Sequence, residues 1–155
     1  MATVKSYQVT DKDASPKVML KPNEGYARAR ALWFSFDTGA AGPAVGDVIQ
    51  LVTVPAKARV LGIYANWEAM SSGAGVAGGD FGDGGDPDRF ITALSMDAAG
   101  SGFQALRLDG TNGLREPALG VGYEYTIEDT VDITVTGEAW AANAMLRGFV
   151  LIARD

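Results

Sequence analysis

The residues best suited to chemistry gather in one short segment, GGDFGDGGDPDRF at residues 78–90, which holds four aspartates and five glycines. Ca²⁺ prefers carboxylate and carbonyl oxygens as ligands, so this segment is a candidate calcium site. Its four candidate ligands are Asp80, Asp83, Asp86 and Asp88. Their spacing does not match the EF-hand loop, which needs a central glycine between specific acids and a distal glutamate. A phosphate-binding loop is disfavoured as well, because no Lys-Ser or Lys-Thr pair follows the glycines and the carboxylates would repel phosphate.

The same segment is also typical of a tight connection between two strands. Aspartate bonds to nearby backbone groups in turns, glycine supplies positive φ, and Pro87 fixes its own φ. On this interpretation Asp86 or Asp88 accepts backbone N–H groups, and Arg89 pairs with a neighbouring carboxylate. We prefer this structural interpretation, expect no metal and no cofactor, and keep the calcium site as the alternative.

The rest of the sequence offers little material for catalysis. It contains neither histidine nor cysteine. A serine–histidine triad, a thiolate nucleophile and a disulfide are therefore excluded. Glu68, Glu124 and Glu128 are candidates for the paired carboxylates of a glycoside hydrolase, but each is more simply explained as a solvated residue at a strand edge. We expect that the protein is not an enzyme.

Three tryptophans, Trp33, Trp67 and Trp140, are candidates for contact with a partner or a sugar. Large aromatic side chains fill cores and interfaces more often than they stack on sugars. Trp140 lies in GEAWAANA, which we predict to be a loop, and it is our candidate for an interface anchor. Packing of Trp140 over the end of the domain is an equally good explanation.

The segments that must position these residues alternate with a period of two, which is typical of β-strands. ARARALWFSF places Phe34 and Trp33 on opposite faces, and VDITVTG places Val131 inward and Asp132 outward. The predicted core residues are Leu32, Phe34, Val60, Ile63, Ile133, Val135, Val150 and Ile152.

About eight such segments follow one another at the spacing of sandwiches and barrels. No segment keeps a helical period for more than a turn or two. Residues 97–117 are polar and rich in glycine, and they are predicted to form a long loop with a small hairpin at LDGTNG. The sequence thus predicts an all-β fold, a single antiparallel β-sandwich or jelly-roll-like domain.

An extended N-terminal arm over residues 1–25 is predicted to precede this domain, which spans residues 26–155. Residues 1–30 hold six basic and three acidic side chains, a net charge of +3, whereas the remainder has a net charge of −9. The arm is therefore expected to dock on an acidic surface, or else to be a solvated tail. Its candidate contact residues are Lys5, Lys12, Lys17, Val18, Met19, Leu20 and Lys21.

The charge and hydropathy also bear on which partners are expected. The acidic body argues against nucleic acid, because phosphates would repel it. No apolar run reaches the roughly 20 residues of a membrane span, and the N-terminus has no apolar signal core, so neither a membrane partner nor export is expected.

Four segments together resemble a group of small β-rich proteins of tailed-phage heads, the decoration or cement proteins. These segments are DVIQLVTVPAKARVLGIYANWEAM, GDGGDPDRFI, YEYTIEDTVDITVTG and RGFVLIARD. The resemblance runs from about Asp47 to the C-terminus, and it departs from the family in the N-terminal segment and at residues 97–117. It implies a non-enzymatic protein on the outer surface of the virion capsid, assembled in the bacterial cytoplasm, which clamps neighbouring major capsid proteins, often as a homotrimer. The alternatives are a carbohydrate-binding or adhesin-like β-sandwich and a low-copy head-completion or tail component.

Overall fold

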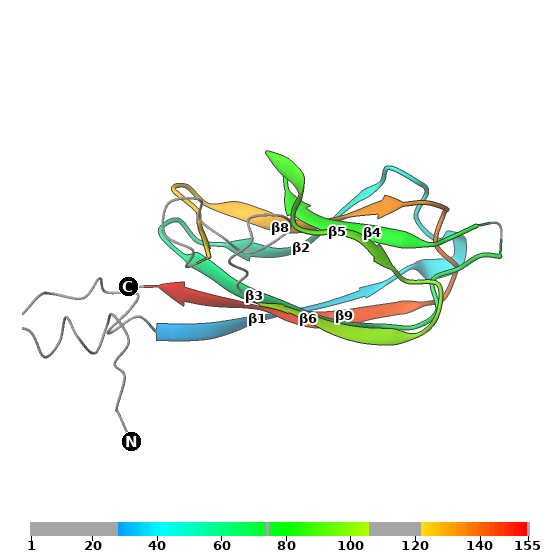
Figure 1. Cartoon of the computed structure of the whole chain (residues 1–155), viewed down its shortest axis with the longest axis horizontal. Coiled ribbons are helices and arrows are strands. Elements are labelled where there is room, and N and C mark those ends of the chain that lie inside the picture. Colours follow the sequence, from blue (N-terminus) through cyan, green and yellow to red (C-terminus); the bar gives the residue numbers. More distant parts are fainter. Residues whose placement is uncertain (1–27, 74, 106–121, 155) are drawn as a thin grey trace, which may run out of the picture.

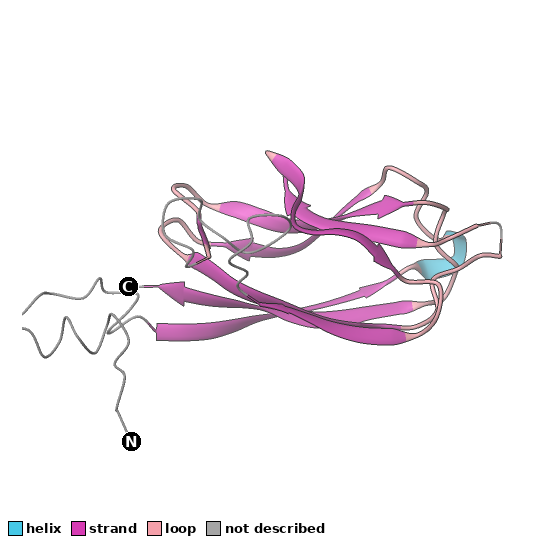
Figure 2. Ribbon diagram, in the orientation of Figure 1, coloured by secondary structure: helices cyan, strands magenta, loops and turns pink. Residues whose placement is uncertain are grey.

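The fold consists of two antiparallel sheets packed face to face, as Figures 1 and 2 show. The computed structural model describes residues 28–73, 75–105 and 122–154. The predicted arm at residues 1–25 and the predicted hairpin at LDGTNG lie outside the described residues. Within the described ranges, no helix has the length and hydropathy that are needed to cross a membrane. The predicted all-β sandwich is confirmed.

The two sheets divide nine strands between them. The five-stranded sheet has the order β1-β9-β3-β6, with β7 paired to the start of β3. Its strands are β1 (Arg28–Asp37), β9 (Met145–Arg154), β3 (Arg59–Trp67), β6 (Gly100–Ala105) and β7 (Tyr123–Glu124). The four-stranded sheet has the order β2-β8-β4-β5. Its strands are β2 (Val48–Val54), β8 (Asp129–Thr136), β4 (Gly78–Asp83) and β5 (Asp86–Ser95), and a short 3₁₀ helix, η1 (Gly39–Ala41), follows β1.

The strand pairing is that of a jelly roll. If the two-residue β7 is left aside, the strands pair in nested order, the first with the last and so on inward: β1 with β9, β2 with β8, β3 with β6 and β4 with β5. This is one long hairpin, and it rolls up so that β9 also pairs with β3 and β8 also pairs with β4. Two sheets of alternating strands result, which is the jelly-roll form of the predicted sandwich.

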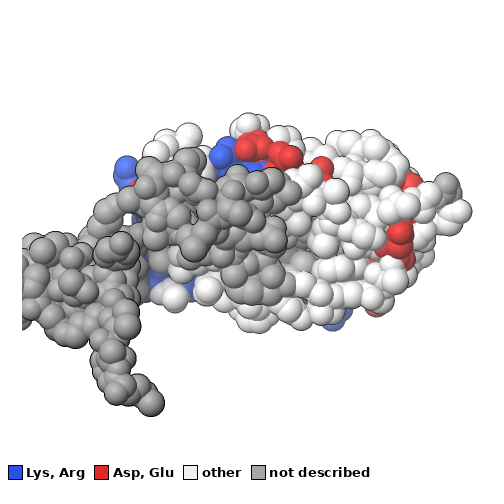
Figure 3. Space-filling view, in the orientation of Figure 1, with Lys and Arg blue, Asp and Glu red and all other residues white. Residues whose placement is uncertain are grey.

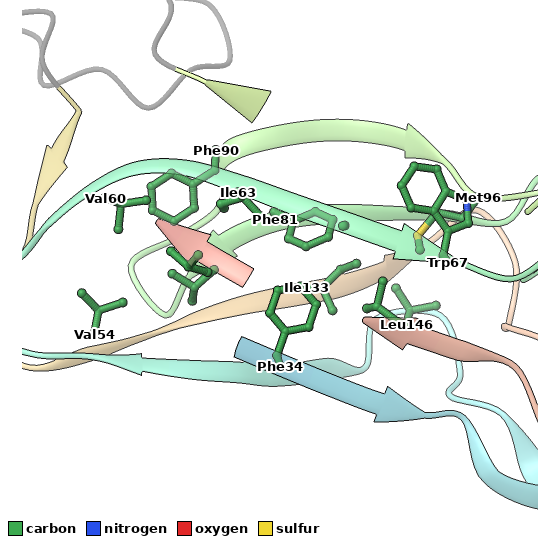
Figure 4. Close-up of a cluster of buried hydrophobic side chains, with 14 of the residues drawn as sticks. Phe34, Val54, Val60, Ile63, Trp67, Phe81, Phe90, Met96, Ile133 and Leu146 are labelled. Atoms are coloured by element: carbon green, nitrogen blue, oxygen red, sulfur yellow. The ribbon is translucent and has the colours of Figure 1, made fainter. Parts of the chain in front are cut away.

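The core lies between the sheets and is built from the inward positions of the alternating strands (Figure 4). Seven of the eight predicted core residues are buried, and Leu32 is half-buried and packs against the others. The sequence patterns did not single out four of the largest buried side chains of the core. These are Phe81, Phe90, Met70 and Met96, all fully buried.

One predicted outward residue is buried. Asp132 of β8 is only 5% exposed. It lies in register with Gly82, and a Cβ built on Gly82 would come within 2.1 Å of the Asp86 carbonyl oxygen. The start of β5 therefore lies close to the position beside Asp132, which explains why this outward position is not open to water. The Asp132 Oδ1 atom has no hydrogen-bond partner, and burial raises the pKa of the carboxyl although a hydrogen bond with Thr130 opposes the shift.

Candidate functional site

The aspartate-rich segment forms the hairpin between β4 and β5, as the turn interpretation predicted. Gly84 and Gly85 are the two turn residues, and Asp83 lies opposite Asp86 in the register. The Asp83 Oδ1 atom accepts the N–H groups of Gly85 and Asp86, each at 2.9 Å. Neither turn glycine has a positive φ, so the turn does not depend on the left-handed backbone conformation that glycine allows. The hydrogen bonds to the Asp83 carboxylate stabilise the turn instead. The sequence predicted that Asp86 or Asp88 would accept a backbone N–H group; the Asp86 carboxyl does accept a backbone hydrogen bond from Asp88, while the acceptor of the two turn N–H groups is Asp83.

The same Asp83 carboxylate carries the hairpin's ion pair. The Arg89 guanidinium donates to it twice, from Nε to Oδ2 at 2.5 Å and from Nη2 to Oδ1 at 3.2 Å, which confirms the predicted pairing of Arg89. The Tyr125 hydroxyl donates to Oδ2 at 3.0 Å. Burial, and next the Asp83 charge, raise the pKa of Tyr125 above its ordinary value. Asp83 is 4% exposed, so its carboxylate is fully engaged within the fold.

This network connects the two sheets. Tyr125 follows β7 of the five-stranded sheet, whereas Asp83 and Arg89 belong to the hairpin of the four-stranded sheet. The Arg89 guanidinium lies 4.0 Å from the ring centroid of Tyr123, and the Tyr123 and Tyr125 rings meet edge to face at 5.0 Å. A cation–π contact and a buried ion pair thus hold one end of the sandwich together.

The other three aspartates of the segment have different surroundings. Asp80 Oδ1 accepts the N–H of Ala93 at 2.5 Å, and Asp88 Oδ2 accepts the hydroxyl of Thr92 at 3.3 Å. A hydrogen bond with the Asp88 carboxyl, and next partial burial, raise the pKa of Asp86. Nowhere in residues 28–73, 75–105 and 122–154 do three or more His, Cys, Asp or Glu side chains form a group that could hold a metal. The four carboxylates are therefore not gathered around one point, as a calcium site would require.

The structure does not bring the three candidate glutamates together. Glu68 follows the last residue of β3 and accepts the Met145 N–H at 3.0 Å. Glu124 forms an ion pair with Arg59, the first residue of β3. These two carboxylates therefore lie at opposite ends of one strand, and Glu128 is exposed in the loop before β8. Glu68 and Glu124 therefore do not form the carboxylate pair of a glycoside hydrolase, and the Glu124 carboxylate is engaged by Arg59.

Trp140, the predicted interface anchor, is part of the core. It is 2% exposed, and its indole N–H donates to the Gly78 carbonyl at 2.9 Å. Trp67 is likewise buried and donates to the Ala98 carbonyl at 3.0 Å. The choice of Trp140 as a partner contact is therefore corrected: the side chain packs over the end of the sandwich, which was the alternative explanation.

The exposed tryptophan is Trp33, on the outer face of the five-stranded sheet. Its side chain is 73% exposed. Trp33, Phe149 and Tyr64 lie side by side in the register of β1, β9 and β3 and form a row of aromatic rings. The Phe149 ring centroid is 5.0 Å from that of Trp33 and 5.4 Å from that of Tyr64. We call this outer surface of β1, β9 and β3 the aromatic face.

The rows on either side of the aromatic rings differ in character. On one side Ala31, Leu151 and Gly62 are in register; because Gly62 is buried, the apolar surface continues over β1 and β9 only. On the other side the row consists of Ser35, Arg147 and Asn66, and Arg147 is exposed. An antiparallel sandwich commonly places polar residues on its outer faces. The aromatic face departs from this pattern.

Charge is distributed unequally between the two sheets. The strands of the five-stranded sheet carry five arginines and two acidic residues, a net charge of +3, whereas those of the four-stranded sheet carry one arginine and six aspartates, a net charge of −5. In the space-filling view, acidic atoms gather over the β4–β5 hairpin, and basic atoms are visible at the end where β1 begins and β9 ends (Figure 3). These charges belong to the strands and not to their outer faces, because Arg28, Arg30 and Arg154 alternate with Trp33 and Phe149 and therefore lie on the core side of their sheet.

Comparison with known proteins identifies relatives of the fold. No protein-family model matches the sequence, and no curated protein sequence matches it. A chain in the structure of the cyanophage Pam1 capsid asymmetric unit is similar, with a TM-score of 0.65 and 18% identity over 92% of this chain and 97% of that chain. A chain in the capsid of Ralstonia phage GP4 is similar with a TM-score of 0.61 and 18% identity, over 84% of this chain and 86% of that chain. At these identities the likeness establishes a shared fold.

Proposed function

We propose that this protein is a non-catalytic structural component of a tailed-phage virion, bound to the outer surface of the capsid. The observation that carries the proposal is the fold likeness to a chain of a phage capsid asymmetric unit, which extends over nearly the whole of both chains. The second phage capsid chain supports the same assignment.

The chemistry of the described residues is consistent with a protein that acts by adhesion. The most concentrated group of acids, on the β4–β5 hairpin, includes a buried carboxylate whose oxygens accept four N–H groups and one hydroxyl. Glu68 is separated from Glu124 by the length of β3. These side chains stabilise the fold, and we assign none of them to turnover of a substrate.

In the proposed arrangement the sandwich is a rigid body that joins neighbouring major capsid proteins in the manner of a decoration or cement protein. The N-terminal segment at residues 1–25, with four lysines and three acidic residues, reaches an adjoining subunit, and the protein assembles on the head in the host cytoplasm as a homotrimer. Individual exposed ion pairs contribute only about 0–1 kcal/mol. Many contacts repeated over several copies are therefore needed for firm attachment.

The carbohydrate-binding alternative loses the residues on which it depended. Trp67 and Trp140 are buried and use their indole N–H groups within the fold. Three of the four aspartates that would hold its calcium ion, Asp80, Asp83 and Asp88, accept hydrogen bonds from different groups within the fold. We therefore keep one proposed function.

Counting copies in purified virions tests the proposal. Quantitative mass spectrometry should find this chain in numbers comparable with those of the shell protein, and particles from which it has been deleted should release their DNA at a lower temperature. A few copies per particle would identify a head-completion or tail component instead. Complete absence from virions would refute the proposal.

A further inference from the structure

We propose that the protonation state of Asp132 controls whether the end of the β4–β5 hairpin is closed against β8. With the carboxyl neutral, the hairpin end covers it, and when the carboxyl ionises, the hairpin end opens to let water reach it. The hairpin end is residues 83–90. This inference goes beyond the proposed function and does not depend on it, because every group involved belongs to the four-stranded sheet.

The end of the hairpin is irregular, which makes it the part of this sheet best able to open. Phe81 pairs with Ile91, and Asp83 pairs with Asp86. Between these two pairs β4 has one residue, whereas β5 has four, residues 87–90. The extra residues of β5 form a large bulge, and the turn stands out from the plane of the sheet (Figure 1). A segment outside the regular ladder opens at a lower free energy than the core does.

The bulge covers Asp132. Gly82 of β4 and Asp132 of β8 lie opposite each other in the register, so their side-chain positions share the outer face of the sheet. A Cβ built on Gly82 would lie 2.1 Å from the Asp86 carbonyl oxygen and 2.4 Å from that of Pro87. The β5 backbone thus occupies the space beside Asp132, which is buried although it points outward. Opening of the hairpin end would return this carboxyl to water.

The immediate surroundings of Asp132 favour its neutral form. Among the described residues, its Oδ1 atom has no hydrogen-bond partner. A hydrogen bond links the carboxyl to Thr130, whose hydroxyl also accepts the Gln50 side-chain amide at 3.3 Å. Burial raises the pKa of Asp132, the Thr130 hydrogen bond lowers it, and the charges of Asp129 and Asp83 raise it further. A buried carboxylate without a full set of hydrogen bonds is costly, so closing the hairpin favours the proton.

The charges of the neighbouring strands act in the same direction. The four strands of this sheet contain six aspartates and a single arginine, Arg89. Its guanidinium donates twice to Asp83 and lies 3.9 Å from an Asp86 oxygen, so its charge is directed at those two carboxylates. The charged groups of the strands packed around Asp132 are Asp129 of β8, Asp80 and Asp83 of β4, and Asp86, Asp88 and Arg89 of β5, whereas β2 has none. A negative charge on Asp132 would add to this acidic excess.

Opening of the hairpin end is therefore coupled to release of one proton. In the open state the carboxyl meets water and titrates near its ordinary pKa of about 4, whereas in the closed state the pKa of Asp132 is raised. Below about pH 4 both states hold the proton. Between about pH 4 and the closed-state pKa, opening releases it, so the opening constant should rise by up to tenfold per pH unit. Above the closed-state pKa the opening constant should level off.

Amide hydrogen exchange, followed by NMR, measures this opening. The N–H groups of Gly85 and Asp86 bond to Asp83 within the hairpin end, so both exchange when it opens. After correction for the intrinsic exchange rate at each pH, their opening constants should rise with pH and then level off. The pH at which they level off should match the titration of the Asp132 carboxyl carbon, measured in the same samples. Both amides should exchange faster than that of Val150, a buried residue of β9 that reports global unfolding.

Two matched variants assign the effect to one carboxyl. Asp132→Asn has the same shape and no proton to release, so its hairpin opening constant should lose the pH dependence and be about fivefold below the wild type at pH 7. Asp88→Asn removes an exposed carboxyl from the same hairpin end and should retain the pH dependence. Melting temperatures check that both variants are folded.

Three results would each overturn the proposal. The first is an Asp132 carboxyl that titrates near its ordinary pKa in the wild type, a measurement that needs no variant. The second is an Asp132→Asn profile that rises with pH as the wild-type profile does. The third is equal exchange of the hairpin amides and the Val150 amide at every pH, which would assign the proton to global unfolding and leave the hairpin end without a motion of its own.

Discussion

Replacement of Asp83 by alanine should destabilise the sandwich more than any other change in its aspartate-rich hairpin. The substitution removes the acceptor for two turn N–H groups and leaves the Arg89 guanidinium and the buried Tyr125 hydroxyl without their carboxylate. Loss of one member of a buried ion pair costs about 3–5 kcal/mol. Because the Arg89 side chain is 22% exposed and water partly replaces the lost partner, we expect the lower end, about 3 kcal/mol.

That loss is large compared with the total stability of a domain, about 5–15 kcal/mol. For a domain of this size it corresponds to a fall in melting temperature of about 6–12 °C. Urea titration monitored by fluorescence measures it, since Trp67 and Trp140 are buried and their emission changes on unfolding. Asp88→Ala, at an exposed position of the same hairpin, is the control and should stay within about 0.5 kcal/mol of the wild type.

A double-mutant cycle separates the ion pair from the turn. If the carboxylate and the guanidinium of Asp83 and Arg89 stabilise each other, the double alanine variant should be less destabilised than the sum of the single variants by about 1 kcal/mol or more. Asp83→Asn retains an acceptor for the turn and should fall between the wild type and the alanine variant. The reasoning is refuted if Asp83→Ala is no less stable than Asp88→Ala, or if the two single effects simply add.

Three further predictions concern other parts of the chain. Asp132→Asn removes a carboxyl group whose pKa is raised by burial in the native state. The unfolded chain releases the proton of this carboxyl near its ordinary pKa of about 4, whereas the native state holds the proton to a higher pH. The wild-type residue therefore lowers the free energy of unfolding as the pH rises through the native pKa. The variant should gain about 1 kcal/mol over the wild type at pH 7 and little at pH 3, and an equal gain at both would contradict this. Gly148→Ala places a Cβ 2.0 Å from the Tyr64 carbonyl oxygen and should cost about 3 kcal/mol, whereas Gly84→Ala meets nothing within 4 Å; equal melting temperatures of the two variants would count against the packing argument. Deletion of residues 1–20 should leave a folded protein that binds empty heads poorly, and unchanged binding would remove the arm from the proposed mechanism.

The sequence predicted the fold class because its local patterns agree with the final arrangement. The alternation in ARARALWFSF puts Phe34 in the core and Trp33 outside, as the structure has them. The tight connection between two strands in the aspartate-rich segment was predicted for the same reason, since aspartate and glycine favour turns through local interactions. Patterns with a period of two therefore sufficed for strands and faces.

Features that depend on distant parts of the chain were not predictable in this way. Trp140 has the local sequence of a loop, and it is buried because its indole N–H finds the Gly78 carbonyl, 62 residues away in sequence. Asp132 alternates as an outward residue, and the neighbouring hairpin covers it. The sequence did not single out Asp83 as the centre of the hairpin network, because the four aspartates have the same chemistry and only the positions of Arg89 and Tyr125 distinguish Asp83.

The aromatic face was not predictable from the sequence for the same reason. Trp33, Phe149 and Tyr64 are far apart in the sequence, and each is unremarkable within its own strand. Only the register of β1 with β9 and of β9 with β3 places the three rings in one row. A surface built across strands cannot be recognised until the strand order is known.

The rolled-hairpin topology has a consequence for synthesis of the protein on the ribosome. The last strand, β9, occupies an interior place between β1 and β3, and Arg28 pairs with Arg154. Until β9 has left the exit tunnel, β1 has no hydrogen-bonded neighbour in the five-stranded sheet. The core side chains on the other strands then lack the sheet against which they pack. Sheets closed by such distant segments form slowly. A ribosome-bound chain that is arrested before β9 has emerged should accordingly be sensitive to proteases along most of its length, and the emergence of β9 should coincide with the gain of resistance.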